Sequence, residues 1–231
     1  MTTLDDLFAR ITKMENMANT YSKERNNTIK IQSCWRGYFS RKELKRPSDN
    51  YNYEYLVECL DHYIHGLKFT ENMNLRLTNK NKKHKLIRQN NFPSDISENI
   101  AKFVIARKYG IMPSWNNKKG DIVIDKSVIF KQIEVKGFTS DGPSSFGPKC
   151  VWDLLYFVDG KDVRNKNFKV YEVKLSNKNF NINISKNQTM FDQKKNVRRP
   201  RSAFYKGIQS QLGDNCKLIF DGNISELDNS F

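Results

Sequence analysis

Three polar side chains in two neighbouring segments have the types and the spacing that phosphodiester hydrolysis requires. Asp121 follows Gly120 at the start of the segment DIVID, and Glu134 and Lys136 lie in the next segment, KQIEVK. Mg²⁺ prefers oxygen ligands and leaves coordination positions open for a phosphate, so two carboxylates beside a lysine are a minimal design for such a site. The trio therefore predicts metal-dependent cleavage of a phosphate ester.

These side chains meet only if the two segments pair in one particular way. Both segments are short and rich in β-branched residues, and they can pair as a β-hairpin around Lys126-Ser127. Alternation along a strand places Glu134 and Lys136 on one face and turns Val135 toward the core. In the hairpin, Asp121 comes opposite the part of the second strand that ends at Glu134. We therefore predict that the three groups meet at one edge of a sheet.

A second motif of the same form lies further along the chain. Glu172-Val173-Lys174 repeats the E-V-K pattern, and Asp159 or Asp162 lies upstream as a carboxylate partner. Alternating Glu and Lys also occur on the outer face of an ordinary half-exposed strand, which is the commoner reason for the pattern. We favour the first motif, because it alone has a predicted helix directly before its strands.

The charge of the chain indicates which kind of substrate would carry the phosphate. The 231 residues include 40 Lys and Arg but only 25 Asp and Glu, which gives a formal net charge of +15 at pH 7. Such a field attracts polyanions, so nucleic acid is the expected partner and a small neutral substrate is not. No apolar run reaches the roughly 18 residues that span a bilayer, so membrane insertion is not expected.

The cysteines argue against two other classes of protein. They lie far apart and form no CxxC pair: Cys34, Cys59, Cys150 and Cys216. This spacing indicates neither a zinc ribbon nor a disulfide framework, so we expect reduced thiols in an intracellular, reducing compartment, the cytoplasm or the nucleus. The first residues also lack the basic and apolar pattern of a secretion signal.

Three regions differ in composition along the chain. Residues 1–47 are predicted to form a helical extension, and residues 48–90 a connecting region with a helix at Leu56–Leu67 and a basic run at Arg76–Arg88. From residue 91 to 231, apolar segments alternate with turns. This texture predicts an α/β (α+β) core, with a mixed central β-sheet flanked by helices.

The predicted elements of this core are a helix, a run of strands and a second helix. The first helix is opened by Asp95 and Glu98 in a capping-box spacing and closed by Gly110. The strands are expected at 121–125, 128–138, 152–158, 168–175 and 216–220, and the second helix at Ser202–Leu212.

With this order of elements, the first motif resembles the PD-(D/E)xK nuclease superfamily, and more particularly its type II restriction endonucleases. The matching residues are Asp121, Glu134 and Lys136, with Gly120 where the superfamily pattern often has proline. The resemblance extends over residues 92–222, through stretches such as SENIAKF, WDLLYFVDG and QTMFDQ.

The resemblance implies a role for each residue of the site. Asp121 and Glu134 would bind Mg²⁺, and the Val135 carbonyl would add a ligand. Lys136 would orient or activate the attacking water and stabilise charge on the phosphate. The superfamily also places a helix carboxylate near the metal, here Glu98, although a helical wheel puts Glu98 off the apolar stripe of its helix.

Polar and basic segments near this motif are candidates for contacts with DNA. The stretch Gly137–Pro148 contains two Gly-Pro pairs and is predicted to be a rigid loop, and the run KKNVRRPR carries five cations without an acid. Arginine binds guanine edges or phosphates, so this run can read sequence or grip the backbone, and the amides of Asn187, Gln188 and Gln193 could read adenine. The candidate DNA-binding residues are Ser144, Ser145, Lys149, Gln188, Lys194, Lys195, Arg198, Arg199 and Arg201.

Near the start of the chain, Ile31–Arg41 (IQSCWRGYFSR) matches the pattern IQxxxRGxxxR and resembles the IQ motif of calmodulin-binding and light-chain-binding proteins. Ile31, Trp35 and Phe39 are spaced by four and form an apolar stripe that suits a helix-binding groove, while the arginines suit acidic lobes. The same stripe could pack on the nuclease body or pair two copies of the chain, and a basic helix could also lie on DNA. The sequence leaves these roles open.

The sequence as a whole predicts a Mg²⁺-dependent, sequence-specific double-stranded DNA endonuclease of the type II restriction type, acting as a homodimer. The alternative is a non-catalytic module that binds nucleic acid or a calmodulin-type protein, in which the acidic residues lie on strands without a catalytic role. Plasmid incubated with Mg²⁺ separates the two, because the first should give discrete bands and the second should leave the plasmid intact.

Overall fold

A mixed sheet forms the centre of the part of the chain that the structure describes. The computed structural model describes residues 53–80, 91–116, 120–126, 129–147, 150–195 and 200–228. Within these residues six strands lie in the order β1 (Ser114–Trp115), β2 (Ile122–Lys126), β3 (Ile129–Phe138), β5 (Leu154–Asp159), β6 (Asn167–Val173) and β10 (Cys216–Asn223). β3 and β5 are parallel and the other neighbours are antiparallel, which confirms the predicted mixed sheet.

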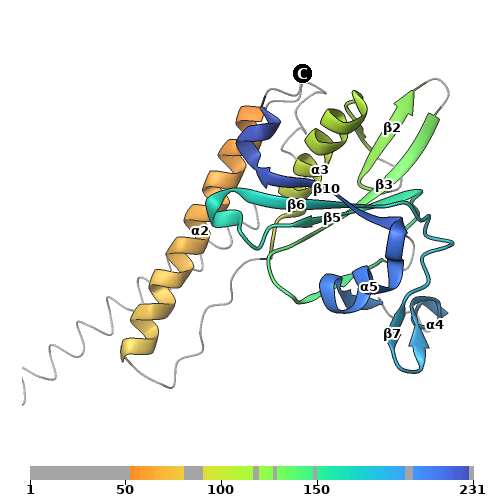
Figure 1. Cartoon of the computed structure of the whole chain (residues 1–231). Helices are drawn as coiled ribbons and strands as arrows, with labels where there is room; N and C mark the ends of the chain where they lie inside the picture. The colour runs from red at the N-terminus through yellow and green to blue at the C-terminus, as the bar shows by residue number, and fades with distance from the viewer. Residues whose placement is uncertain are drawn as a thin grey trace, which may run out of the picture. The chain divides into compact units, whose positions relative to one another are not determined.

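Helices cover both faces of this sheet (Figure 1). The long helices α2 (Tyr53–Lys80) and α3 (Ser94–Tyr109) pack on one face, and the short helices α4 (Met190–Lys195) and α5 (Gln209–Leu212) pack on the other. Short turns of helix complete the body: η1 (Val163–Asn165), the π-helical η2 (Phe204–Ile208), η3 (Gly213–Asn215) and η4 (Ile224–Leu227).

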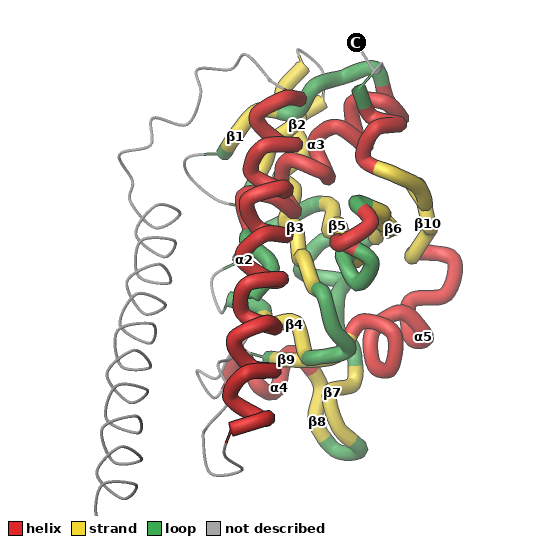
Figure 2. The backbone as a smooth tube through the Cα atoms, turned by 90° about the vertical axis from the view of Figure 1, so that its left-hand side faces the viewer, coloured by secondary structure: helices red, strands yellow, loops and turns green. Residues whose placement is uncertain are grey.

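Two small sheets lie at one end of the body, together with α4 (Figure 2). One pairs β4 (Pro143–Ser145) with β9 (Arg201–Ala203), and the other is the hairpin of β7 (Asn183–Ser185) and β8 (Gln188–Thr189). The predicted helix at Ser202–Leu212 is therefore only partly present, because β9 takes its first residues and η2 precedes α5. None of the helices in the described residues is long and apolar enough to span a bilayer.

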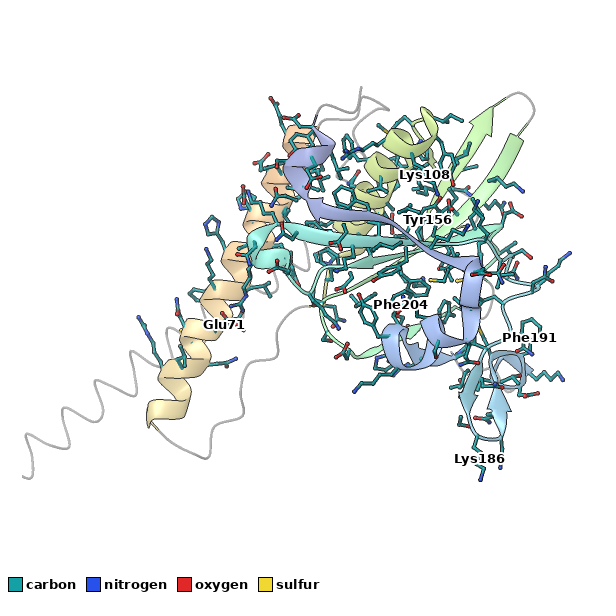
Figure 3. All side chains as sticks on the ribbon, in the orientation of Figure 1. Glu71, Lys108, Tyr156, Lys186, Phe191 and Phe204 are labelled. Carbon is teal, nitrogen blue, oxygen red and sulfur yellow. The ribbon has the colours of Figure 1, made fainter. Side chains whose placement is uncertain are left out.

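The two faces of the sheet carry separate apolar cores, because successive strand residues point to opposite sides. On the α3 side, Ile133 and Tyr156 belong to one buried cluster, and on the other side Leu155, Phe157 and Phe204 belong to a second. Figure 3 shows Tyr156 and Phe204 on opposite sides of the sheet. β5 is thus buried on both faces, which explains its unbroken apolar sequence LLYFV.

α2 is longer than the helix predicted at Leu56–Leu67, and it shares its core with α3. Its buried residues recur every three to four positions and form one stripe: Leu56, Leu60, Tyr63, Ile64 and Leu67. This stripe belongs to the same cluster as the buried face of α3. The sequence interpretation grouped residues 48–90 as a connecting region, whereas the structure packs 53–80 onto the body.

α3 ends as predicted but begins differently. Gly110 has a φ of 64°, and its N–H donates to the Ala106 carbonyl at 2.7 Å, so it caps the C-terminus. At the other end, Pro93 precedes the first turn and no side chain caps it, so the predicted capping box of Asp95 and Glu98 is wrong. Asp95 lies in the first turn, where its negative charge suits the helix dipole.

Candidate active site

The predicted hairpin forms, and it places Asp121 beside the E-V-K motif of β3. β2 pairs with β3 in a register that sets Ile122 opposite Ile133. Just before this pair, the Asp121 backbone N–H donates to the Ile133 carbonyl at 3.0 Å. The Asp121 carboxylate bonds further along β3, where its Oδ2 accepts a hydrogen bond from the Val135 N–H at 2.7 Å. Asp121 therefore lies at the point where β3 runs on beyond the start of β2.

The backbone conformation of Gly120 excludes proline at the position before Asp121. The φ of Gly120 is +76°, which proline cannot adopt because its ring fixes φ at about −65°. A Cβ added at Gly120 would also lie 3.1 Å from the Ile133 carbonyl oxygen. The glycine therefore allows the chain to turn closely against β3 immediately before Asp121.

Glu134 and Lys136 share one face of β3, while Ile133 and Val135 are buried in the α3-side core. The Glu134 side chain is ion-paired through Oε1 with the Nζ of Lys136, and Glu134 is only 3% exposed. Burial opposes the positive charge of Lys136, but the negative charges of Glu134 and Asp121 outweigh burial and raise the pKa of Lys136. Lys136 is therefore a cation at neutral pH, held beside the carboxylates.

Cys150 is a residue of the site that the sequence interpretation missed. Its Sγ lies 3.4 Å from Glu134 Oε1, in the geometry of a thiol donating to a carboxylate. Gly147 makes room for the thiol, because a Cβ there would lie 2.6 Å from Cys150 Sγ. Burial and then the charge of Glu134 raise the pKa of the thiol, so it remains a neutral donor. The parallel pairing of β5 with β3 brings this segment alongside Glu134, and no local spacing signals that pairing.

Oxygen donors for a hard cation gather at the part of β3 that extends beyond β2. Asp121 and Glu134 supply carboxylates, and the Val135 carbonyl points to the same edge as its N–H, because both groups of a strand residue lie on one side. These donors are all oxygen atoms, which are the ligands that Mg²⁺ prefers. Among the described residues, no group of three or more His, Cys, Asp or Glu side chains is arranged to hold a metal ion. A cation here would therefore rely on the backbone carbonyl and on water for its further ligands.

Glu98 is buried, contrary to the helical wheel that placed it away from the covered side of its helix. It is 7% exposed, because α3 approaches β3 very closely at this point. A Cβ added at Gly137, directly after the E-V-K motif, would lie 2.5 Å from the Ser97 Cβ. α3 covers the face opposite to that of Glu134 and Lys136, so a metal role for Glu98 remains a prediction.

The second E-V-K motif is built into a buried network. Glu172 is fully buried, so the interpretation of this strand as half-exposed with a charged outer face is wrong for this residue. Its carboxylate accepts from Lys108 Nζ at 2.8 Å, from the Tyr156 hydroxyl at 2.6 Å and from the Tyr109 hydroxyl. Burial alone would raise the pKa of Glu172, but these donors outweigh it and lower the pKa.

The upstream acids considered as partners of Glu172 do not join it. Asp159 lies opposite Lys169, at the other end of the β5–β6 pair, and its Oδ2 accepts from the Tyr205 hydroxyl. Asp162 lies in the turn before β6 and accepts from the side chains of Asn165 and Asn167. The structure thus brings the predicted carboxylates together only at the first motif.

Part of the predicted DNA-binding set is also brought together. β4 and β9 pair antiparallel, so Ser144 and Ser145 lie beside Arg201, and the Phe146 N–H donates to the Pro200 carbonyl at 3.0 Å. The predicted loop at Gly137–Pro148 is therefore partly a strand, fixed to the end of the basic run.

The remaining DNA-binding candidates are dispersed or lie outside the described residues. Gln188 is in β8, where its Oε1 accepts from Gln193 at 3.2 Å, and Lys195 is exposed at the end of α4. Lys194 is placed in α4 by its backbone. The following candidates lie outside the described residues: Lys149, Arg198, Arg199 and the IQ-like segment Ile31–Arg41.

Comparison with known proteins gives matches to two protein-family models. A model described as Bsp6I restriction endonuclease matches residues 67–211, which is more than half of the chain. A model of the IQ calmodulin-binding motif matches residues 25–45. No curated protein and no solved structure matches the chain.

Proposed function

The chain belongs to the Bsp6I restriction endonuclease family, and we propose that it is a Mg²⁺-dependent, sequence-specific endonuclease of type II that hydrolyses phosphodiester bonds of double-stranded DNA. The observation that carries this proposal is the bond from the Val135 N–H to Asp121, next to the ion pair of Glu134 and Lys136. It sets two carboxylates, a backbone carbonyl and a cation at the part of β3 that extends beyond β2, and this is where the phosphate would bind.

Each of these residues has a defined part in the proposed reaction. Asp121, Glu134 and the Val135 carbonyl would hold Mg²⁺, which supplies a polarised water and positive charge for the phosphate. Lys136, kept protonated by its acidic neighbours, donates toward the oxygens on which negative charge develops. Cys150 and Lys136 both contact Glu134 Oε1, so they fix the orientation of this carboxylate before DNA binds.

Incubation of supercoiled plasmid with the full chain and Mg²⁺ tests the proposal. Wild type should give discrete bands, and Glu134→Gln should give none while it still binds DNA in Ca²⁺. The matched control is Asp214→Asn, which removes an exposed carboxylate in η3 and should cut like wild type. Intact plasmid with wild type in Mg²⁺ would favour the alternative, a binding module without catalysis.

Cleavage of both DNA strands also requires two active sites or two successive binding events. We propose a homodimer in which each copy cuts one strand, since closed two-fold symmetry matches a palindromic site. Sedimentation equilibrium with and without a cognate duplex should show two chains per duplex. Accumulation of nicked circles with a single chain per duplex would contradict this part of the proposal.

A second function, binding of a calmodulin-type protein, is favoured by the IQ match over residues 25–45. The emission of Trp35 in a peptide of residues 25–45 should shift to the blue on titration with calmodulin, because the ring would enter an apolar groove. Ile31→Asp, which breaks the apolar stripe, should abolish the shift. An unchanged spectrum with the wild-type peptide would remove this candidate.

A further inference from the structure

The β7–β8 hairpin projects from the body on the same side of the sheet as Glu134 and Lys136. Figure 1 shows it extending beyond α5, and Figure 3 shows Lys186 at its end, pointing away from the body. Asn183, Ser185, Lys186 and Asn187 are all exposed. A two-stranded ribbon of this kind has the width that the major groove of DNA admits.

The base of this hairpin is held firmly, so its tip has a fixed direction. Phe180, just before β7, is fully buried, and its ring centroid lies 5.5 Å from that of Phe146 and 5.8 Å from that of Trp152. Gln211 of α5 adds two hydrogen bonds: its Oε1 accepts from the Asn183 N–H at 2.7 Å and its Nε2 donates to the Asn183 carbonyl at 2.9 Å. A fixed tip loses little conformational entropy when it binds.

The same apolar cluster joins the hairpin base to the candidate active site. Phe146 and Trp152 lie on either side of Cys150 in the sequence, and Cys150 contacts Glu134. The Trp152 carbonyl accepts a hydrogen bond from the Asn177 N–H at 3.0 Å, and the Trp152 indole N–H donates one to the Leu175 carbonyl at 3.1 Å. DNA seated at Glu134 would therefore meet the hairpin as part of the same body.

The charge around the hairpin suits a polyanion. From residue 178 to 201 the chain has seven Lys and Arg but one acid, Asp192. The Asp192 carboxylate is turned to Thr189, from which it accepts the backbone N–H at 3.0 Å and the hydroxyl at 2.8 Å. The Asp192 carboxylate is thus hydrogen-bonded at the start of α4, while Lys186 is exposed to solvent.

We propose that the β7–β8 hairpin enters the major groove of the DNA substrate and that Lys186 and Asn187, at its tip, read base edges. The inference rests on the proposed function and adds the element that selects the sequence. An asparagine amide offers one donor and one acceptor in the spacing of adenine N6 and N7, and a lysine ammonium donates to guanine O6 and N7. The basic residues nearer the base of the hairpin would contact phosphates.

The test compares Lys186→Ala and Asn187→Ala with a matched control in the full-length protein. The control is Lys68→Ala, which removes the same charge from an exposed position on α2, on the opposite side of the sheet. The cognate duplex is selected from a random pool by wild-type binding in Ca²⁺, so its choice does not depend on cleavage. Fluorescence anisotropy then gives Kd for the cognate duplex, for each single-base variant of it and for a scrambled duplex.

Each tip variant should bind the cognate duplex about tenfold to a hundredfold more weakly and lose its preference at one base position, while its affinity for scrambled DNA hardly changes. Lys68→Ala should keep full discrimination. Equal weakening on cognate and scrambled DNA, or no weakening at all, would overturn the inference. A wild type that binds selectively through the tip but never cuts would instead refute only the nuclease, so the two failures are distinguishable.

Discussion

The tripeptide Glu-Val-Lys occurs in β3 and again in β6, and the two copies have different neighbours. In β3, Glu134 and Lys136 pair with each other beside Asp121, where the strand runs beyond its neighbour β2. In β6, Glu172 lies between β5 and β10 and is bound by Lys108 and Tyr156. Both glutamates are buried, but the first lies where β3 extends beyond β2, whereas the second lies in a strand with a neighbour on each side.

The difference lies in the neighbouring elements, not in the motif. A strand that extends past its partner leaves a backbone carbonyl and carboxylates with capacity for a ligand. A strand enclosed by two others under a helix has its carboxylate satisfied by fixed donors, which contributes to stability. The comparison thus predicts that mutation of the first motif lowers the rate of DNA cleavage and that mutation of the second lowers the free energy of unfolding.

The largest expected effect is the loss of cleavage in Glu134→Ala or Asp121→Ala. Either change removes an oxygen ligand at the end of β3, so single-turnover cleavage should fall by roughly three powers of ten or more. DNA binding in Ca²⁺ should persist, because phosphate contacts lie elsewhere. Full cleavage by Glu134→Ala, together with lost cleavage by a folded Glu172→Ala, would reverse the choice between the motifs.

Lys136→Ala should lower turnover by about two to three powers of ten, with little change in Kd. The ammonium acts on charge that develops during the reaction, so its contribution strengthens toward the transition state. The matched control is Lys174→Ala in the second motif, whose side chain is 56% exposed and which should cut normally. If binding and turnover fell equally in Lys136→Ala, the lysine would be a phosphate clamp only.

Glu172→Ala should cost the fold about 3 kcal/mol or more, as measured by urea unfolding. The change leaves the Tyr156 hydroxyl buried without its acceptor and leaves Lys108 without its carboxylate. Glu134→Ala should cost less, because the Lys136 side chain is 20% exposed and can turn toward water once its partner is removed. Equal destabilisation by the two changes would remove this distinction between the two motifs.

Much of the fold could be predicted from the sequence, because its signals are local. Alternating apolar residues mark β2, β3 and β6, and Gly110 marks the end of α3. Only two residues separate β2 from β3 in the sequence, which favours the hairpin that positions Asp121. The burial of Glu172 could not be predicted, since it depends on Lys108 and Tyr109, which are more than 60 residues away in sequence.

The same reason explains the residues of the site that were missed. Cys150 comes near Glu134 only through the parallel pairing of β3 with β5, and periodicity within either strand does not reveal which strand lies beside it. Likewise, Ser202 and Ala203 have the local sequence of a helix start, but pairing with β4 draws them into β9. Long-range pairing overrides local preference in both cases.

A smaller effect concerns the acid dependence of stability. The pKa of Glu172 is lowered in the fold, so its contribution is complete above about pH 4.3, the usual value for an unfolded glutamate, and is lost as pH falls through the lower folded value. The free energy of unfolding should therefore differ between wild type and Glu172→Gln at pH 6, and this difference should shrink at pH 3. A difference that stays the same at both values would show that the charge of Glu172 contributes nothing.

The smallest expected effect is at Cys150, which acts on the first motif as a positioning residue. Cys150→Ala removes one neutral donor from Glu134 Oε1, so cleavage should fall about fivefold, the equivalent of roughly 1 kcal/mol for one hydrogen bond. The Mg²⁺ concentration for half-maximal activity should rise, while Kd for DNA in Ca²⁺ should not change. Cys150→Ser keeps a donor and should recover most of the activity.

Cys216→Ala, at another partly buried free thiol on the same side of the sheet, is the control and should leave the Mg²⁺ dependence unchanged. If both alanine variants shifted it alike, the effect would come from packing, and the carboxylate of the first motif would need no donor beyond Lys136.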